Sequence, residues 1–188
     1  GVQTCALPIC GSTHNVPLVN GEGEEPPQAG ELVRFSASPA EVSVAQPRYQ
    51  PKSSATRSLR IDGDKLVDVA TVRCTDDARK NLGLALHLQG KVRLPANFAA
   101  EKDFAKGRPD AFKQWKNVRS AAFTNRAEFD VDYGGTIMHV VLETPGEFRV
   151  FHGSTPDAPP RRRDSFYLQL ATPATTATFM TIFSPAAH

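Results

Sequence analysis

Histidine side chains offer the most chemistry in this sequence, and His14 is the first to consider. It stands beside Asn15 in a stretch, residues 11–25, that continues into a short apolar run and a Gly-rich polar turn. A histidine before a strand can ligate a metal through one ring nitrogen while an acceptor holds the other. A metal site needs three or more ligands, and no His, Cys or acidic residue stands at short ligand spacing from His14. The residues alone favour a structural histidine, with a metal ligand as the alternative.

His87 is the second candidate. It lies in an apolar run in which Leu86 and Leu88 would point to the opposite face of a strand. Its ring could line a cleft and bind a substrate, or it could hydrogen-bond across strands, which is the commoner role. No histidine has an adjacent Ser or Asp arrangement that suggests a nucleophile. The sequence therefore gives His87 as a candidate substrate-binding residue and predicts no catalytic residue.

The elements that must position these side chains are short strands. Segments in which apolar and polar residues tend to alternate recur at short intervals, and 15 Pro and 13 Gly punctuate them. Asp62-Gly63 lies between two apolar runs and predicts a type I′ hairpin turn. The strands are expected at residues 16–19, 31–37, 41–45, 57–61, 65–73, 82–90, 91–94, 119–123, 127–131, 136–143, 147–151, 165–171 and 175–183.

One segment departs from this pattern. Residues 97–116 have helical character, but Gly107-Arg-Pro109 interrupts them, so at most two short helices fit. We expect an inserted excursion within an otherwise all-β chain. About a dozen strands with turn signals between them predict an antiparallel β-sandwich of two packed sheets, with a short helical insertion near residues 97–116.

Composition and charge exclude two classes of partner. The net charge of +2 is spread along the 188 residues without a basic stripe, which argues against nucleic-acid binding. No apolar run approaches the roughly 20 residues of a membrane-spanning helix, so we expect no membrane span. Arg161-Arg-Arg163 could bind an anionic polymer, but beside Pro159 and Pro160 an exposed loop is the favoured interpretation.

The first ten residues do not resemble the rest of the chain. Residues 1–9 match one reading frame of a common sequencing adapter, and we expect residues 1–10 to be a non-native leader on a domain formed by residues 11–188. The natural N-terminus would then be missing. Cys5 and Cys10 belong to the leader and its junction. This leaves Cys74, for which we predict a packed or edge thiol rather than a disulfide or a nucleophile.

Four segments in order resemble the C-terminal half of the heparinase II/III-like polysaccharide lyases. Residues 13–21 (THNVPLVNG) are similar to the family's His-Asn segment, although Glu24 or Glu25 stands where a Gln is usual. Residues 56–69 (TRSLRIDGDKLVDV) resemble its Arg-containing hairpin. Residues 87–90 (HLQG) and 179–185 (FMTIFSP) resemble two later strands. The resemblance covers residues 11–185.

The resemblance implies an activity and a metal for a longer protein. Family members join an α/α toroid to a β-sandwich and cleave uronic-acid polysaccharides by β-elimination. Many hold a structural zinc, for which His14 matches the last ligand. The other zinc ligands, the catalytic His-x-His motif, the catalytic Tyr and the toroid would all precede residue 11. We therefore expect an inactive fragment with weak zinc binding at best, from a periplasmic or secreted enzyme on acidic polysaccharide.

A non-catalytic carbohydrate-binding or adhesion-like sandwich is the alternative. An all-β pattern without a catalytic set is compatible with it, because fold alone does not decide function. A strip of exposed aromatic side chains on one sheet face would favour this alternative. A sandwich that normally packs on a toroid should instead expose an apolar patch and be prone to aggregation when isolated.

Overall fold

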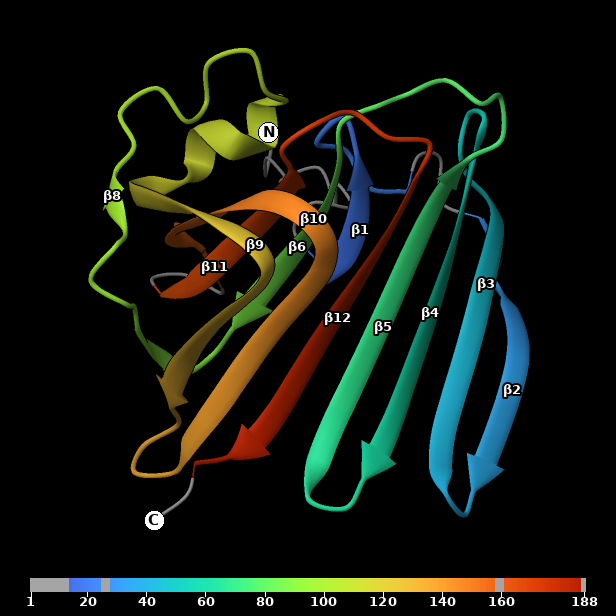
Figure 1. The fold of residues 1–188 in the computed structure, drawn as a ribbon, viewed down its shortest axis with the longest axis horizontal. Helices are drawn as coiled ribbons and strands as arrows, with labels where there is room; N and C mark the ends of the chain where they lie inside the picture. The colour runs from blue at the N-terminus through green and yellow to red at the C-terminus, as the bar shows by residue number, and fades with distance from the viewer. Residues whose placement is uncertain (1–13, 25–27, 158–160, 187–188) are drawn as a thin grey trace, which may run out of the picture.

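The computed structural model describes residues 14–24, 28–157 and 161–186, so the leader, Cys5, Cys10 and Pro159-Pro160 lie outside the described residues. Twelve strands and one short 3-10 helix form in this part of the chain (Figure 1). The strands are β1 (Val16–Val19), β2 (Glu31–Ala37), β3 (Ala40–Gln50), β4 (Ser53–Asp62), β5 (Lys65–Cys74), β6 (Leu82–Leu88), β7 (Lys91–Arg93), β8 (Ala99–Ala100), β9 (Lys116–Asp132), β10 (Ile137–Pro156), β11 (Arg162–Leu170) and β12 (Thr176–Pro185).

The strands form one antiparallel sheet that bends over on itself. Its order is β1-β6-β11-β10-β12-β5-β4-β3-β2, and β9 pairs with β10, β7 and β8. The first part of β10 pairs with β12 through residues 138–143, and its second part pairs with β11 through residues 148–156. The bend lies between these parts, where Gly146 has a positive φ of 86° and its N–H donates to Asn125 Oδ1 at 2.8 Å. β10 therefore belongs to both layers of the sandwich (Figure 1).

The core lies between the two layers. Alternate residues of β5, β9, β10 and β12 meet alternate residues of β6 and β11 there, and all are buried. Phe129 and Phe166 stack with ring centroids 4.3 Å apart, and they come from strands on different sides of the fold. Cys74 is buried in the same core as a free thiol, as predicted. Burying this many apolar side chains is the main force that holds the layers together.

The insertion covers the outer face of the second layer. Phe104, Phe112 and Trp115 pack on Phe151 and Tyr167 to form a second, smaller core. The only regular helix in the described part of the insertion is a 3-10 turn, Asp110–Gln114, which follows Pro109. The predicted excursion is present, but its local structure is mostly irregular, and Ala99–Ala100 form a strand on β9.

Several predicted strand boundaries, and one predicted turn type, were wrong. Residues 119–131 lie in one continuous strand, as do residues 137–151, because β9 and β10 pair on both sides of the bend. In the β4–β5 hairpin, Asp62 pairs with Lys65, so the turn residues are Gly63 and Asp64. Only Gly63 has a positive φ, which fits a type II′ turn rather than the expected type I′.

Arg162 and Arg163, expected in an exposed loop, belong to β11. Arg162 is exposed and donates to Ser154 Oγ at 2.8 Å. No helix in the described ranges is long and apolar enough to cross a membrane.

Strand β2 forms an exposed edge of the sheet, at the right of Figure 1. Leu32, Val33 and Phe35 on this strand are 64–74% exposed. An exposed apolar edge strand is a template for pairing with another chain. The expected apolar patch is therefore present on this half of the sheet, where Val44, Ile61 and Leu66 are also exposed.

We predict that Val33→Lys reduces self-association of the chain, because a charge on the edge strand opposes edge-to-edge pairing. Sedimentation velocity over a range of concentrations would show a smaller associated fraction than for the unmodified chain. The thermal midpoint should stay the same, because Val33 packs against little of the core. An unchanged associated fraction would mean that the edge does not drive association.

Candidate functional site

His14 is exposed and lies in the bend just before β1. Within the described residues, no three His, Cys, Asp or Glu side chains lie close enough together to hold a metal ion. The described residues around His14 therefore do not make up a zinc-binding set by themselves. Zinc binding at His14 stays a prediction for a longer protein that supplies further ligands.

Its neighbour Asn15 joins the two layers. The Asn15 side-chain oxygen accepts a hydrogen bond from the backbone N–H of His87 in β6, at 2.6 Å. Its carbonyl accepts one from Arg57 Nη1 in β4, at 2.5 Å. Two residues later, the carbonyl of Pro17 accepts a hydrogen bond from the Tyr49 hydroxyl in β3, at 2.5 Å. Three strands are thus tied to the start of β1.

Arg57 is itself held by a buried carboxylate. Its Nε and Nη2 donate to the two oxygens of Asp68 in β5, at 2.8 and 2.6 Å, in the bidentate geometry that makes such pairs strong. Asp68 is buried and lies opposite Thr181 of β12 in the strand register. We call Asn15, Arg57, Asp68 and His87 the Asn15 cluster.

The His87 ring is buried on the outer face of the second layer. Its Nδ1 lies 2.6 Å from Ser165 Oγ, which lies 2.6 Å from Thr155 Oγ1. The Trp115 ring lies over it at 6.5 Å between centroids. The cross-strand hydrogen bond, one of the two alternatives, is therefore present. Substrate binding by His87 stays a prediction, because a ring 9% exposed offers little surface to a ligand.

A histidine–carboxylate pair, His152 with Asp164, was missed by sequence reasoning. His152 Nε2 lies 2.9 Å from Asp164 Oδ1, and Asp164 Oδ2 accepts the N–H of Val92 at 3.1 Å. A carboxylate only accepts, so Nε2 carries the proton. Burial raises the pKa of Asp164, but the hydrogen bonds from His152 and Val92 outweigh it, so the pKa lies below its ordinary value.

Neither pair is arranged as a catalytic triad. Ser165 is fully buried, so its hydroxyl cannot reach a substrate. Strand register brings the partners together. His87 and Ser165 are 78 residues apart in the sequence, and His152 and Asp164 are 12 residues apart. No local sequence signal could have revealed them.

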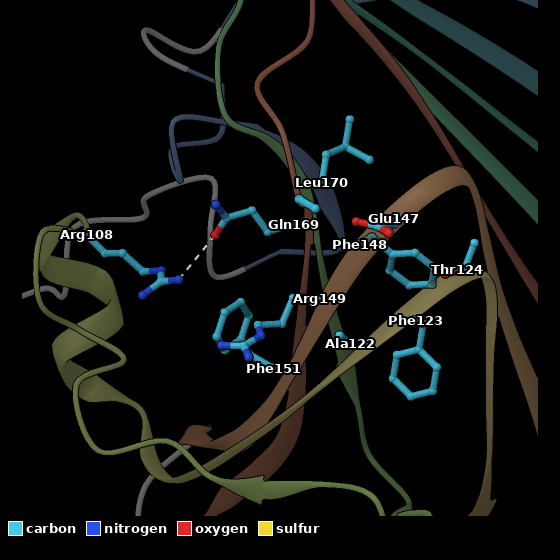
Figure 2. Close-up of a pocket in the computed structure, with 11 residues that line it drawn as sticks. Arg108, Ala122, Phe123, Thr124, Glu147, Phe148, Arg149, Phe151, Gln169 and Leu170 are labelled. Carbon is cyan, nitrogen blue, oxygen red and sulfur yellow. Dashed lines mark hydrogen bonds between the residues drawn. The ribbon is translucent and has the colours of Figure 1, made fainter.

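A hollow lies on the outer surface beside the insertion, and Figure 2 shows the residues that line it. Its volume is about 590 Å³, within the roughly 300–1,000 Å³ of small-molecule sites. Two arginines and an amide are among its polar lining groups, and phenylalanine rings are among the apolar ones. The lining includes Arg108, Arg149, Gln169, Glu147, Phe123 and Phe151.

Arg108 reaches into this hollow from the insertion. Its guanidinium carbon lies 4.7 Å from the ring centroid of Phe151 and 4.8 Å from that of Phe104. Nη2 donates to Gln169 Oε1 at 3.2 Å, and Nη1 donates to the carbonyl of Phe104. Burial lowers the pKa of the Arg108 guanidinium. Tyr167 and Glu101 partly oppose this lowering, and the charge of Arg149 adds a smaller one.

Comparisons with known proteins find structures with a similar fold but no matching family. No family model and no curated protein matches the chain. Several solved structures are similar, among them the following two. The Slr1438 protein from Synechocystis sp. PCC 6803 is 14% identical over 85% of this chain and 66% of its own, with a TM-score of 0.48. A 4-alpha-glucanotransferase from Thermococcus litoralis is 11% identical over 87% of this chain, with a TM-score of 0.50.

The present chain spans only 23% of the glucanotransferase. At this identity the likeness shows that the chain shares a fold with part of that protein, and nothing more.

We predict that Asn15→Ala lowers the free energy of unfolding by about 1–3 kcal/mol, because the backbone N–H of His87 loses its acceptor in a partly buried place. Urea unfolding followed by tryptophan fluorescence would measure the loss. Asn81→Ala is the matched control. It removes an exposed amide and should change stability by less than about 0.5 kcal/mol. Equal effects of the two changes would contradict the role given to Asn15.

We predict that Asp164→Asn destabilises the chain at pH 6 and has a smaller effect at pH 3. The folded-state pKa of Asp164 lies below that of the unfolded chain. Its contribution is therefore complete above the unfolded pKa of about 4 and is lost as the pH falls through the folded-state pKa. Unfolding free energies of both proteins at the two pH values would check this. An equal difference at both would rule out the carboxylate charge as the cause.

Proposed function

We propose that this chain is the C-terminal β-sandwich of a heparinase II/III-like polysaccharide lyase, an enzyme that cleaves uronic-acid polysaccharide by β-elimination. The observation that carries the proposal is the Asn15 cluster. The four segments that resemble the family are far apart in the sequence. Three of them supply Asn15, Arg57 with Asp68, and His87, which are joined by hydrogen bonds. The fourth supplies Thr181, which lies opposite Asp68.

The convergence supports the resemblance for a physical reason. Segments that matched a family by chance would have no reason to contain the residues that bond to one another. The similar segments here contain both partners of the two hydrogen bonds that join Asn15 to Arg57 and to His87. They therefore behave as one structural unit.

In this proposal the chain supplies support rather than chemistry. β-Elimination needs a group that neutralises the uronate carboxylate, a base for the neighbouring C5 proton and an acid for the leaving oxygen. The family places these groups in the toroid and in a His-x-His motif, which would precede residue 11. The described residues offer no exposed histidine–tyrosine pair for such steps. The Asn15 cluster would hold the segment that carries His14 against the sandwich.

A carbohydrate-binding module without catalysis is the second candidate, and the hollow of Figure 2 favours it. The strip of exposed aromatic residues that would have strengthened it does not form in the described part of the chain. There, the large exposed aromatic side chains are Phe35 on β2 and Tyr133 in the turn after β9. Strand β2 and the turn between β9 and β10 lie at opposite sides of the molecule (Figure 1).

Recovery of the complete gene tests the proposal. We expect an upstream helical toroid, a His-x-His motif and a signal peptide for the periplasm or for secretion. The full-length protein should release unsaturated uronate from an acidic polysaccharide, measured by ultraviolet absorbance. The present chain alone should release none. The proposal fails if the upstream sequence lacks the toroid, or if the isolated chain is active.

A further inference from the structure

We propose that the hollow beside the insertion binds the carboxylate of a hexuronate residue in an acidic oligosaccharide, with Arg108 and Arg149 as its two cationic groups. The choice of hexuronate rests on the proposed function. The choice of a carboxylate-bearing ligand rests on the side chains themselves.

Strand register builds the floor of the hollow. Arg149 of β10 lies directly between Ala122 of β9 and Gln169 of β11. Because side chains alternate along a strand, these three point to the same outer face. The insertion covers the next row, which contains Phe151 and Tyr167, and it leaves this row open. The small side chain of Ala122 leaves room in front of Arg149.

Arg108 is held in place before any ligand arrives. Aromatic rings flank its guanidinium, and Gln169 and the Phe104 carbonyl accept two of its N–H groups. A guanidinium has five N–H donors, so three remain to which no described residue is bonded. An ordered guanidinium loses little conformational entropy on binding, which favours affinity.

Arg149 offers the second cation. Its Nη1 donates to Glu101 Oε2 at 3.3 Å, and Glu101 also accepts from Ser120. This contact orients the guanidinium and leaves its other donors available. The guanidinium carbon lies 5.9 Å from the Phe151 ring centroid, the same ring on which Arg108 lies. Glu101 is paired with Arg149 and not with Arg108, so an anion between the two guanidinium groups could accept hydrogen bonds from both.

The two ends of the hollow differ in charge. Figure 2 shows Arg108, Gln169 and Arg149 toward one end and Glu147 with Thr124 toward the other. A carboxylate would be attracted to the first end and repelled from the second. Glu147 and Thr124 can instead bond to sugar hydroxyls. Phe123 adds an apolar surface near Thr124. This distribution fits an oligosaccharide in which an acidic residue is joined to a hydroxyl-rich neighbour.

The test is titration of the full 188-residue chain with a galacturonate tetrasaccharide, followed by isothermal calorimetry at low salt. Maltotetraose, a neutral oligosaccharide, is the second probe. We expect saturable binding of the acidic probe and at least about tenfold weaker binding of the neutral one, because charge-assisted hydrogen bonds to the carboxylate are lost. Equal affinity for the two probes, or no saturable binding, would overturn the proposal.

Two substitutions locate the binding. Arg149→Ala should weaken binding of the acidic probe about tenfold. Ala122→Glu should abolish it, because the new carboxylate would lie beside Arg149 and occupy the guanidinium groups. Both positions are exposed, so the fold should survive, and circular dichroism would confirm this. Arg60→Ala is the control. Arg60 lies on β4, far from the hollow, where it is exposed and makes a weak ion pair with Asp62. Binding of the acidic probe should therefore stay within about twofold.

The outcomes separate this proposal from the proposed function. Binding that Arg149→Ala weakens, in a chain whose complete protein releases no unsaturated uronate, would leave the site standing and reject the lyase. Lyase activity in the complete protein, together with unchanged binding in both hollow variants, would reject the site and leave the lyase.

Discussion

The fold depends on one strand that serves two layers. β10 pairs with β12 before the bend at Pro145-Gly146 and with β11 after it, while β9 follows it on both sides. A strand that changes sheets at a corner keeps its backbone hydrogen bonds satisfied throughout. The second layer therefore needs no long connection. It is carried over the first by the continuation of the same strand.

Alternation of apolar and polar residues located most strands, and β1 and β2 were predicted to the residue. It failed where tertiary pairing overrode a local signal. The separate strands predicted at residues 136–143 and 147–151 belong to one strand, because pairing with β9 continues beyond Pro145-Gly146 with a shift of register. The β4–β5 hairpin was recognised from Asp62-Gly63, yet the register moved its turn by one residue. Local chemistry therefore indicated where the chain bends, but not how each bend is built.

The candidate sites were less accessible to sequence reasoning than the fold. The resemblance selected segments 13–21, 56–69 and 87–90, but it gave no reason for Asn15 to bond to both others. The hollow was not foreseen at all, because Arg108 comes from an irregular insertion and Arg149 and Gln169 become neighbours only through the β10–β11 register. The charge pattern of the sequence indicated residues 161–163, not Arg108 or Arg149, as a possible anion-binding segment.

The exposed outer strands have a consequence for how the molecule moves. β2 has no buried residue, and the half of the sheet that it ends is covered on neither face by the second core. Its hydrogen bonds can break without opening the core around Phe129 and Phe166. Amide hydrogens in β2 should therefore exchange with solvent through local opening, at rates set by far less than the free energy of global unfolding. Those in the middle of β10 should exchange only when the whole sandwich unfolds. The protein thus combines a rigid two-layered sandwich with a single-layered outer part of the sheet, ending at β2, whose hydrogen bonds open locally.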